Sequence, residues 1–154
     1  MKLVCMTGGT ADTAAAVLLQ KHRGLLAERF SARFLAGVGC PQKAERPLFA
    51  EQAEPVAEGG LWAALWRLGE RAGTGLTVAA ERIPIAQETV EICEVLNEDP
   101  YQLPSSGEVF LCDAEYAFAD GRKDAAPFCV IGHTTETAAR TVTIGERVRY
   151  LNRG

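Results

Sequence analysis

The sequence predicts an α/β domain built on a mixed β-sheet with helices on one or both of its faces. Short apolar segments bounded by glycines alternate with segments of helical periodicity, and the chain closes on a run of strands. This order of elements is typical of a mixed sheet that packs against helices. The length of 154 residues and the hydrophobic content of 47% fit one globular domain spanning residues 1–154.

The first predicted elements are a strand, a glycine turn and a helical region. Lys2–Met6 is apolar and predicts the strand, and residues 7–10 predict the turn. Either Thr10 or Asp12 can cap the helix that follows, which runs through an alanine-rich stretch. Gly24 predicts a break within this helical region.

The segment after this region carries few regular signals. Ser31 can cap one further helical turn, which glycines soon end. Residues 40–57 contain three prolines, so we expect a mobile, solvent-facing connection there. A short helix between Ala44 and Ala53 is an alternative within this connection.

The clearest helix begins at the Gly59–Gly60 turn. Leu61, Leu65 and Leu68 recur at helical spacing, and a glycine at 73 or 75 ends the helix. Two tryptophans, Trp62 and Trp66, stand four residues apart on it. For this pair we consider core packing or a protein–protein face.

The rest of the chain predicts one more helix and several strands. Pro84 suits a helix start, and the stretch from Ala114 to Asp120 predicts a short helix or a loop. The predicted strands are Leu76–Ala79, Glu108–Cys112, Phe128–Gly132, Thr141–Ile144 and Arg147–Leu151, the last two forming a hairpin around Gly145 and Glu146.

Composition excludes several classes of function. The net charge of −4 and the lack of a basic run argue against nucleic-acid binding. No apolar stretch approaches the roughly 20 residues of a membrane helix, and the apolar start is too short for a signal peptide. We therefore expect a cytoplasmic protein with neither nucleic-acid nor membrane partners.

The five cysteines predict neither disulfides nor a metal site. No pair has the C-x-x-C spacing, and their number is odd. Cys5, Cys93, Cys112 and Cys129 have apolar neighbours, so we expect buried, reduced thiols. Cys40, in a loop, is the candidate for an exposed, reactive thiol.

Three stretches resemble the C-terminal domain of the AIR synthase-related, PurM-like superfamily. They are Thr7–Leu19, Glu28–Leu35 and the long block Glu58–Gly107, which is the most specific. Within the superfamily, the hydrogenase expression/formation maturation factors are the most similar. The resemblance covers about Leu3–Leu151 and implies an α/β/α-layered domain with a mixed sheet.

The resemblance also implies what a second domain normally supplies. Superfamily members carry an N-terminal domain that binds ATP and metal through acidic residues and builds the dimer. This sequence starts at Met1 directly in the C-terminal domain. We therefore expect no cofactor in the isolated chain, and Mg-ATP only together with an N-terminal-type partner domain.

Two departures from the family pattern bear on activity. The family usually has a threonine preceded by an acidic residue before the Glu-Gly-Gly turn, where this chain has Glu54–Ala57. The maturation factors end in a cysteine that carries the carbamoyl group, whereas this sequence ends Leu151–Gly154. We expect a non-catalytic binding or assembly module that forms homo-oligomers. The alternatives are a subunit of an ATP-dependent enzyme and a fragment of a longer protein.

Candidate site residues cluster at glycine turns. Free N–H groups at the start of a helix favour phosphate or carboxylate, although an ordinary helix start explains the same glycines and Glu58 would repel an anion. A nucleophilic serine would need a base, and the sequence has two histidines, His22 and His133. We predict anion binding at Glu58, Gly59, Gly60 and Leu61, and possible cleft positions at Thr7, Gly8, Gly9, Thr10, Ser105 and Ser106.

Overall fold

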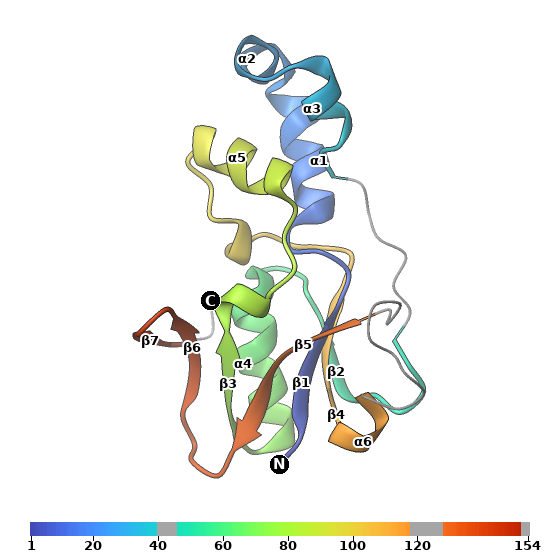
Figure 1. Ribbon diagram of the computed structural model, residues 1–154, viewed down its shortest axis with the longest axis vertical. Coiled ribbons are helices and arrows are strands. Elements are labelled where there is room, and N and C mark those ends of the chain that lie inside the picture. The colour runs from blue at the N-terminus through green and yellow to red at the C-terminus, as the bar shows by residue number, and fades with distance from the viewer. Residues whose placement is uncertain (40–45, 118–127, 152–154) are drawn as a thin grey trace.

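The computed structural model describes residues 1–39, 46–117 and 128–151, and it contains a seven-stranded mixed sheet (Figure 1). The strand order is β2-β4-β1-β5-β3-β6-β7. β3 and β6 pair in parallel, and all other neighbours pair antiparallel. The strands are β1 Leu3–Thr7, β2 Glu51–Pro55, β3 Gly75–Ala79, β4 Glu108–Cys112, β5 Phe128–Thr135, β6 Arg140–Ile144 and β7 Arg147–Tyr150. The predicted fold class is confirmed.

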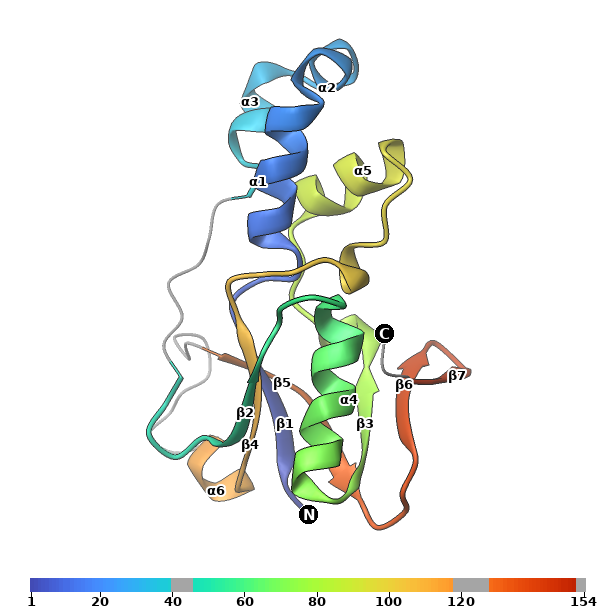
Figure 2. The same cartoon turned by 180° about the vertical axis from the view of Figure 1, so that it is seen from behind.

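One long helix, α4 (Gly60–Ala72), lies along one face of the sheet (Figure 2). Leu61, Leu65 and Leu68 are fully buried on it, as their spacing predicts. They pack against alternate residues of the strands, such as Val4 and Val78, to form the main core. α4 ends at Gly73, whose φ of 66° is the left-handed conformation that glycine adopts at helix ends.

Four other helices gather beyond one end of the sheet (Figure 1). They enclose a second apolar cluster that includes Leu19, Leu26, Leu35 and Ile92. The helices are α1 Asp12–Lys21, α2 Arg23–Arg29, α3 Ala32–Ala36 and α5 Gln87–Val95. This end is also where the turns after β1 and before β4 lie.

On the face of the sheet opposite α4, a further apolar cluster lies over β1 and β4. Cys5, Phe110 and Phe128 are buried there, with Phe49 packed against them. The short helix α6 (Ala114–Ala117) lies on the same side, and Tyr116 stacks on Phe49 at 5.4 Å between ring centroids. Among the described residues, no helix has the length and apolarity that a bilayer span requires.

Several sequence-based expectations need correction. Glu51–Pro55 is not a solvent-facing connection but a strand, because its backbone pairs with β4. No helix forms in the described part of the predicted Ala44–Ala53 segment, residues 46–53. Residues 40–45, including Cys40, lie outside the described residues, as does the end of the predicted Ala114–Asp120 element.

Three helix boundaries also differ from those expected. The break before α2 falls at His22 rather than Gly24, because His22 leaves helical geometry with a φ of −120°. Ala11, in the left-handed conformation, precedes α1, so neither Thr10 nor Asp12 is the cap residue. α5 starts at Gln87, after the 3₁₀ turn η1 (Ala80–Arg82), rather than at Pro84. Ser31 does cap α3, because its Oγ accepts a hydrogen bond from Phe34 N at 3.1 Å.

Candidate functional site

The predicted turns after β1 and before β4 lie against each other. Thr7 Oγ1 accepts a hydrogen bond from Glu108 N at 2.9 Å. A Cβ on Gly107 would stand 1.9 Å from Thr7 O, and one on Gly8 would stand 3.0 Å from Gly107 Cα. Only glycines allow two backbones to approach this closely. The fold thus brings Thr7–Thr10 together with Ser105–Gly107, which are about 100 residues apart in sequence.

Asp12 fastens these two turns to each other. Its carboxylate accepts hydrogen bonds from Ser106 Oγ at 2.5 Å and from Ser106 N at 2.9 Å. It also accepts one from Thr13 N, at 2.7 Å, in the first turn of α1. The side chain is buried, so its negative charge is satisfied by donors of the protein itself. A carboxylate used in this way is a structural clamp for Ser106.

The segment that leads to the Gly59–Gly60 turn joins the same cluster. Val56 N donates to Gly107 O at 3.0 Å, and Ser105 N donates to Val56 O at 2.9 Å. β2 therefore continues past Pro55 alongside the Ser105–Gly107 turn. The three turns 7–10, 56–60 and 105–107, here called the turn cluster, meet at one end of the sheet.

The two glycines of the α4 turn have different surroundings. Gly59 has a φ of 89° and is partly exposed. Gly60 is buried, and a Cβ there would stand 2.4 Å from Tyr101 O, in the 3₁₀ turn η2 (Pro100–Gln102). The Gly60 N–H donates to Ala57 O at 3.0 Å. Leu61 is fully buried in the core, so of the four predicted anion-site residues, Glu58 and Gly59 are the ones at the surface.

An open depression of about 680 Å³ lies beside this turn. Its lining includes Glu58, Gly59, Arg67 and Gln102. Thr10 Oγ1, in the neighbouring turn, is buried without a hydrogen-bond partner in the part of the chain that the structure describes. Near the start of α4, the depression is therefore lined by a negatively charged side chain, Glu58, and a positively charged one, Arg67.

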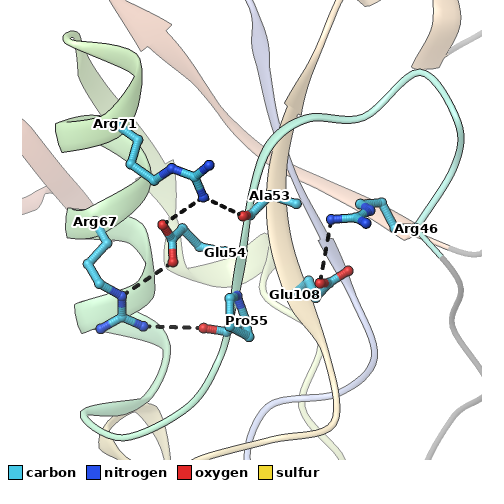
Figure 3. A network of polar contacts seen from close by, with 7 residues as sticks. All are labelled: Arg46, Ala53, Glu54, Pro55, Arg67, Arg71 and Glu108. Carbon is cyan, nitrogen blue, oxygen red and sulfur yellow. Dashed lines mark hydrogen bonds and ion pairs between the residues drawn. The ribbon is translucent and has the colours of Figure 1, made fainter.

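Glu54 and Arg67 line the depression, and Arg71 contacts the same carboxylate (Figure 3). Glu54, on β2, has one oxygen 3.0 Å from Arg71 Nη1 and the other 3.5 Å from Arg67 Nε. Both arginines come from α4, one helical turn apart. They also donate to backbone carbonyls of β2, Arg67 to Pro55 O at 3.2 Å and Arg71 to Ala53 O at 2.9 Å. Glu54 therefore holds β2 against α4.

Among the described residues, the serines before β4 do not pair with His133 as a nucleophile with its base. Ser106 Oγ is bonded to Asp12. His133 pairs with Leu3, at the end of β1 opposite to Thr7. Within the described residues, no group of three or more histidine, cysteine or acidic side chains could hold a metal ion. The combination of Ser105 or Ser106 with His133, which the sequence left open, does not form.

The thiols fall into two groups. Burial raises the pKa of Cys5, whose sulfur lies 3.6 Å from that of Cys112, and burial likewise raises the pKa of Cys112. Burial, with the charges of Glu98 and Asp99 adding to it, raises the pKa of Cys93 to about 11. These three are the buried thiols that the sequence predicted. Cys129, the second residue of β5, is exposed instead.

The two tryptophans of α4 have different surroundings. Trp62 is buried and stacks on Tyr101, with 4.7 Å between ring centroids. Burial, with the charge of Asp99 adding to it, raises the pKa of the Tyr101 hydroxyl. Trp66 is half-buried, and the Arg140 guanidinium lies 5.2 Å from its ring centroid. Core packing is thus confirmed for Trp62.

The fold is of the PurM-like class, as the likeness to solved structures shows. The chain superposes on HypE of E. coli with a TM-score of 0.71 at 15% identity, covering 99% of this chain and 50% of that one. A HypE–HypF complex gives 0.70 at 16% identity, covering 99% and 53%. Thiamine monophosphate kinase of Aquifex aeolicus gives 0.64 at 18% identity, covering 92% and 49%. At these low sequence identities, the structural similarities establish the fold alone.

Sequence comparison points to one branch of this class. The chain is 34% identical over 107 residues to carbamoyl dehydratase HypE of Rhodobacter capsulatus, over 62% of this chain and 32% of that protein. It is 36% identical over 53 residues to a putative hydrogenase expression/formation protein of Methanocaldococcus jannaschii, over 34% and 16%. No family model matches the chain. The predicted resemblance is confirmed: the chain is similar to a HypE-like C-terminal domain of PurM-like fold.

The chain spans about a third of the Rhodobacter relative and about half of each solved HypE structure. What those proteins do as a whole is therefore not shown for this chain.

Sequence reasoning missed two features of the site. Asp12 was considered only as a helix cap, and nothing local shows that its partner is Ser106. The ion pairs of Glu54 with Arg67 and Arg71 were missed as well. Arg67 and Arg71 are four residues apart on the clearest helix, which is a usable signal, but a lone glutamate on an irregular segment gives none.

Proposed function

We propose that this domain is a binding or assembly module related to the hydrogenase maturation factors, without a catalytic site of its own. The observation that carries the proposal is the turn cluster. Thr7 and Ser106 of the cluster, with Asp12 beside it, bond to one another or to the backbone, so they hold shape rather than offer a nucleophile or a base.

The module would present the rim of the depression beside Gly59 to another protein unit. Glu54 and Arg67 are fixed by their mutual contact, and Gly59 brings backbone to the surface beside them. A rim fixed before binding loses little conformational entropy on association. The partner can be a second copy of the chain or an ATP-binding domain on a separate polypeptide.

The second candidate function is a subunit of an ATP-dependent enzyme. It is favoured by the similarity to carbamoyl dehydratase HypE and by a solved relative described as HypE in complex with ATP. In this arrangement the partner domain supplies the metal carboxylates and binds Mg-ATP, while the turn cluster forms the opposite wall.

An ATP-hydrolysis assay separates the two functions. The chain is assayed alone, and then with the N-terminal domain of Rhodobacter capsulatus HypE, with that domain alone as control. If the domain is a binding module, the mixture should hydrolyse ATP no faster than the N-terminal domain alone, and the chain alone should show no turnover. A gain on mixing supports the enzyme subunit. Turnover by the chain alone, if it is lost in Ser106→Ala, contradicts both.

A further inference from the structure

Among the described residues, nothing pairs with the outer edge of the sheet at strand β7. All four of its residues, Arg147–Tyr150, are exposed, and in the described part of the chain β6 is the strand that pairs with it. Figure 1 shows the β6–β7 hairpin standing out at the side of the sheet, away from β2.

The pairing register shows which backbone groups of β7 are available. Leu151 N donates to Arg140 O at 2.8 Å, so Leu151 faces β6. Backbone groups alternate in direction along an antiparallel strand, so Arg149 and Arg147 face β6 as well. The N–H and C=O groups of Val148 and Tyr150 therefore point away from β6, toward the open edge.

The side chains of β7 also alternate. Val148 and Tyr150 lie on one face and are 58% and 69% exposed. Arg147 and Arg149 lie on the other face, two residues apart, and neither forms an ion pair with a described residue. The edge thus combines free backbone groups with a positive stripe on one face and an apolar stripe on the other.

A second copy of the chain fits this edge poorly. A two-fold axis that continues the sheet edge to edge pairs residues of the same face. In the registers that pair most of β7, with the axis at Val148 or at Arg149, it sets Arg147 opposite Arg149 of the partner subunit, or Arg149 opposite its own copy. Like charges directly opposite each other on neighbouring strands are destabilising. The charges of β7 select against self-pairing and in favour of a negatively charged strand.

We propose that β7 is a docking edge for an extended segment of another protein, which adds to the sheet as an eighth strand. Acidic residues at alternate positions of the segment face Arg147 and Arg149, and apolar or β-branched residues between them cover Val148 and Tyr150. The inference is independent of the proposed function, because β7 is separate from the turn cluster.

The test is an NMR titration of the ¹⁵N-labelled full chain with a synthetic eight-residue peptide in which glutamate alternates with valine and threonine. A peptide with lysine in place of each glutamate is the control. The Val148→Pro variant removes an N–H that points outward, and Val148→Thr keeps that N–H as a matched control.

The acidic peptide is expected to shift the amide signals of Val148 and Tyr150 and to bind at least about tenfold more tightly than the lysine peptide. Val148→Pro weakens binding by a similar factor, while Val148→Thr does not. The double variant Arg147→Glu with Arg149→Glu reverses the preference. No binding of the acidic peptide, or binding that Val148→Pro and charge reversal leave unchanged, overturns the proposal. Concentration-dependent shifts at Val148 and Tyr150 without peptide would instead assign the edge to a second copy.

Discussion

The two outer strands of the sheet, β2 and β7, present different edges to their surroundings. Carbonyl groups of β2 at Ala53 and Pro55 are bonded by the arginines of α4. The strand also contains an irregular register between Glu51 and Glu54, with Gln52 at a φ of 53°. No side chain among the described residues bonds the carbonyl groups of β7 in this way, and all residues of β7 are exposed.

This difference shows how one sheet can be closed on one side and open on the other. Irregular geometry and covering groups prevent a strand edge from pairing with another chain. β2 has both, and it leads directly into the turn cluster, whose shape it helps to fix. β7 has only its arginines, which select the kind of strand that can pair with it. The β2 edge therefore supports the candidate site, and the β7 edge is an interaction surface.

The largest expected effect is at the turn that follows β2. Gly60→Ala places a Cβ 2.4 Å from Tyr101 O at a φ of 73°, and should lower the free energy of unfolding by about 3 kcal/mol. Gly73→Ala is the matched control, because φ is 66° but a Cβ there meets nothing within 4 Å, so about 1 kcal/mol is expected. Urea unfolding followed by circular dichroism measures both. Equal losses would contradict the close approach at Gly60.

The next effect tests the clamp on the β2 edge. Glu54→Gln removes the charge that two arginines share, and should lower the free energy of unfolding by about 2 kcal/mol, because the carboxylate is nearly buried. Glu51→Gln, on the same strand, loses an ion pair to Lys2 that solvent screens, so its loss of stability should be clearly smaller. Chemical denaturation of both variants checks the difference, and a smaller loss in Glu54→Gln than in Glu51→Gln would sink the assignment.

A third effect tests which residues of β7 face outward. Arg149→Pro removes an N–H that faces β6 and should destabilise the hairpin by about 1–2 kcal/mol. Val148→Pro removes an outward N–H and should change stability by less than about 0.5 kcal/mol. Amide hydrogen exchange at Val142 and Ile144, whose N–H groups face β7 in this register, reports the hairpin directly. Faster exchange in Val148→Pro than in Arg149→Pro would mean that the register is reversed.

The smallest expected effect compares an exposed cysteine, Cys129, with a buried one, Cys93. Alkylation at pH 8, mapped by mass spectrometry, should modify exposed Cys129 at least about tenfold faster than Cys93. The raised pKa of Cys93, about 11, keeps its thiol protonated in the folded state. Its contribution to stability is therefore full below the ordinary thiol pKa of 9.0 and is lost as the pH rises through about 11. Equal labelling of the two cysteines at pH 8 would contradict their assignment.

Elements with strong local signals could be predicted from the sequence. α4 has its leucine spacing and a glycine at each end, and the β6–β7 hairpin has alternating residues around a two-residue turn. β2 could not be predicted, because its residues are mostly polar and it becomes a strand by pairing with β4 and contacting the arginines of α4. Long-range pairing of this kind leaves no periodic pattern.

The candidate site was predicted as separate pieces. Glycine turns marked residues 7–10, 59–60 and 105–107 in the sequence, yet their meeting depends on the strand order and on hydrogen bonds such as that of Asp12 with Ser106. The burial of Gly60 and Leu61 could not be foreseen either, because η2 covers that turn from a distant part of the sequence. The anion site at residues 58–61 stays a prediction.

The most direct measurement of the central claim is a calorimetric titration of the chain with Mg-ATP, with AMP and inorganic phosphate as controls. The account predicts no micromolar binding of Mg-ATP, because in it the domain binds another protein unit rather than a nucleotide; phosphate binding at residues 58–61 is the separate anion-site prediction. Micromolar binding of Mg-ATP by the chain alone, abolished by a substitution at Gly59, would contradict the account and would establish a nucleotide site beside α4.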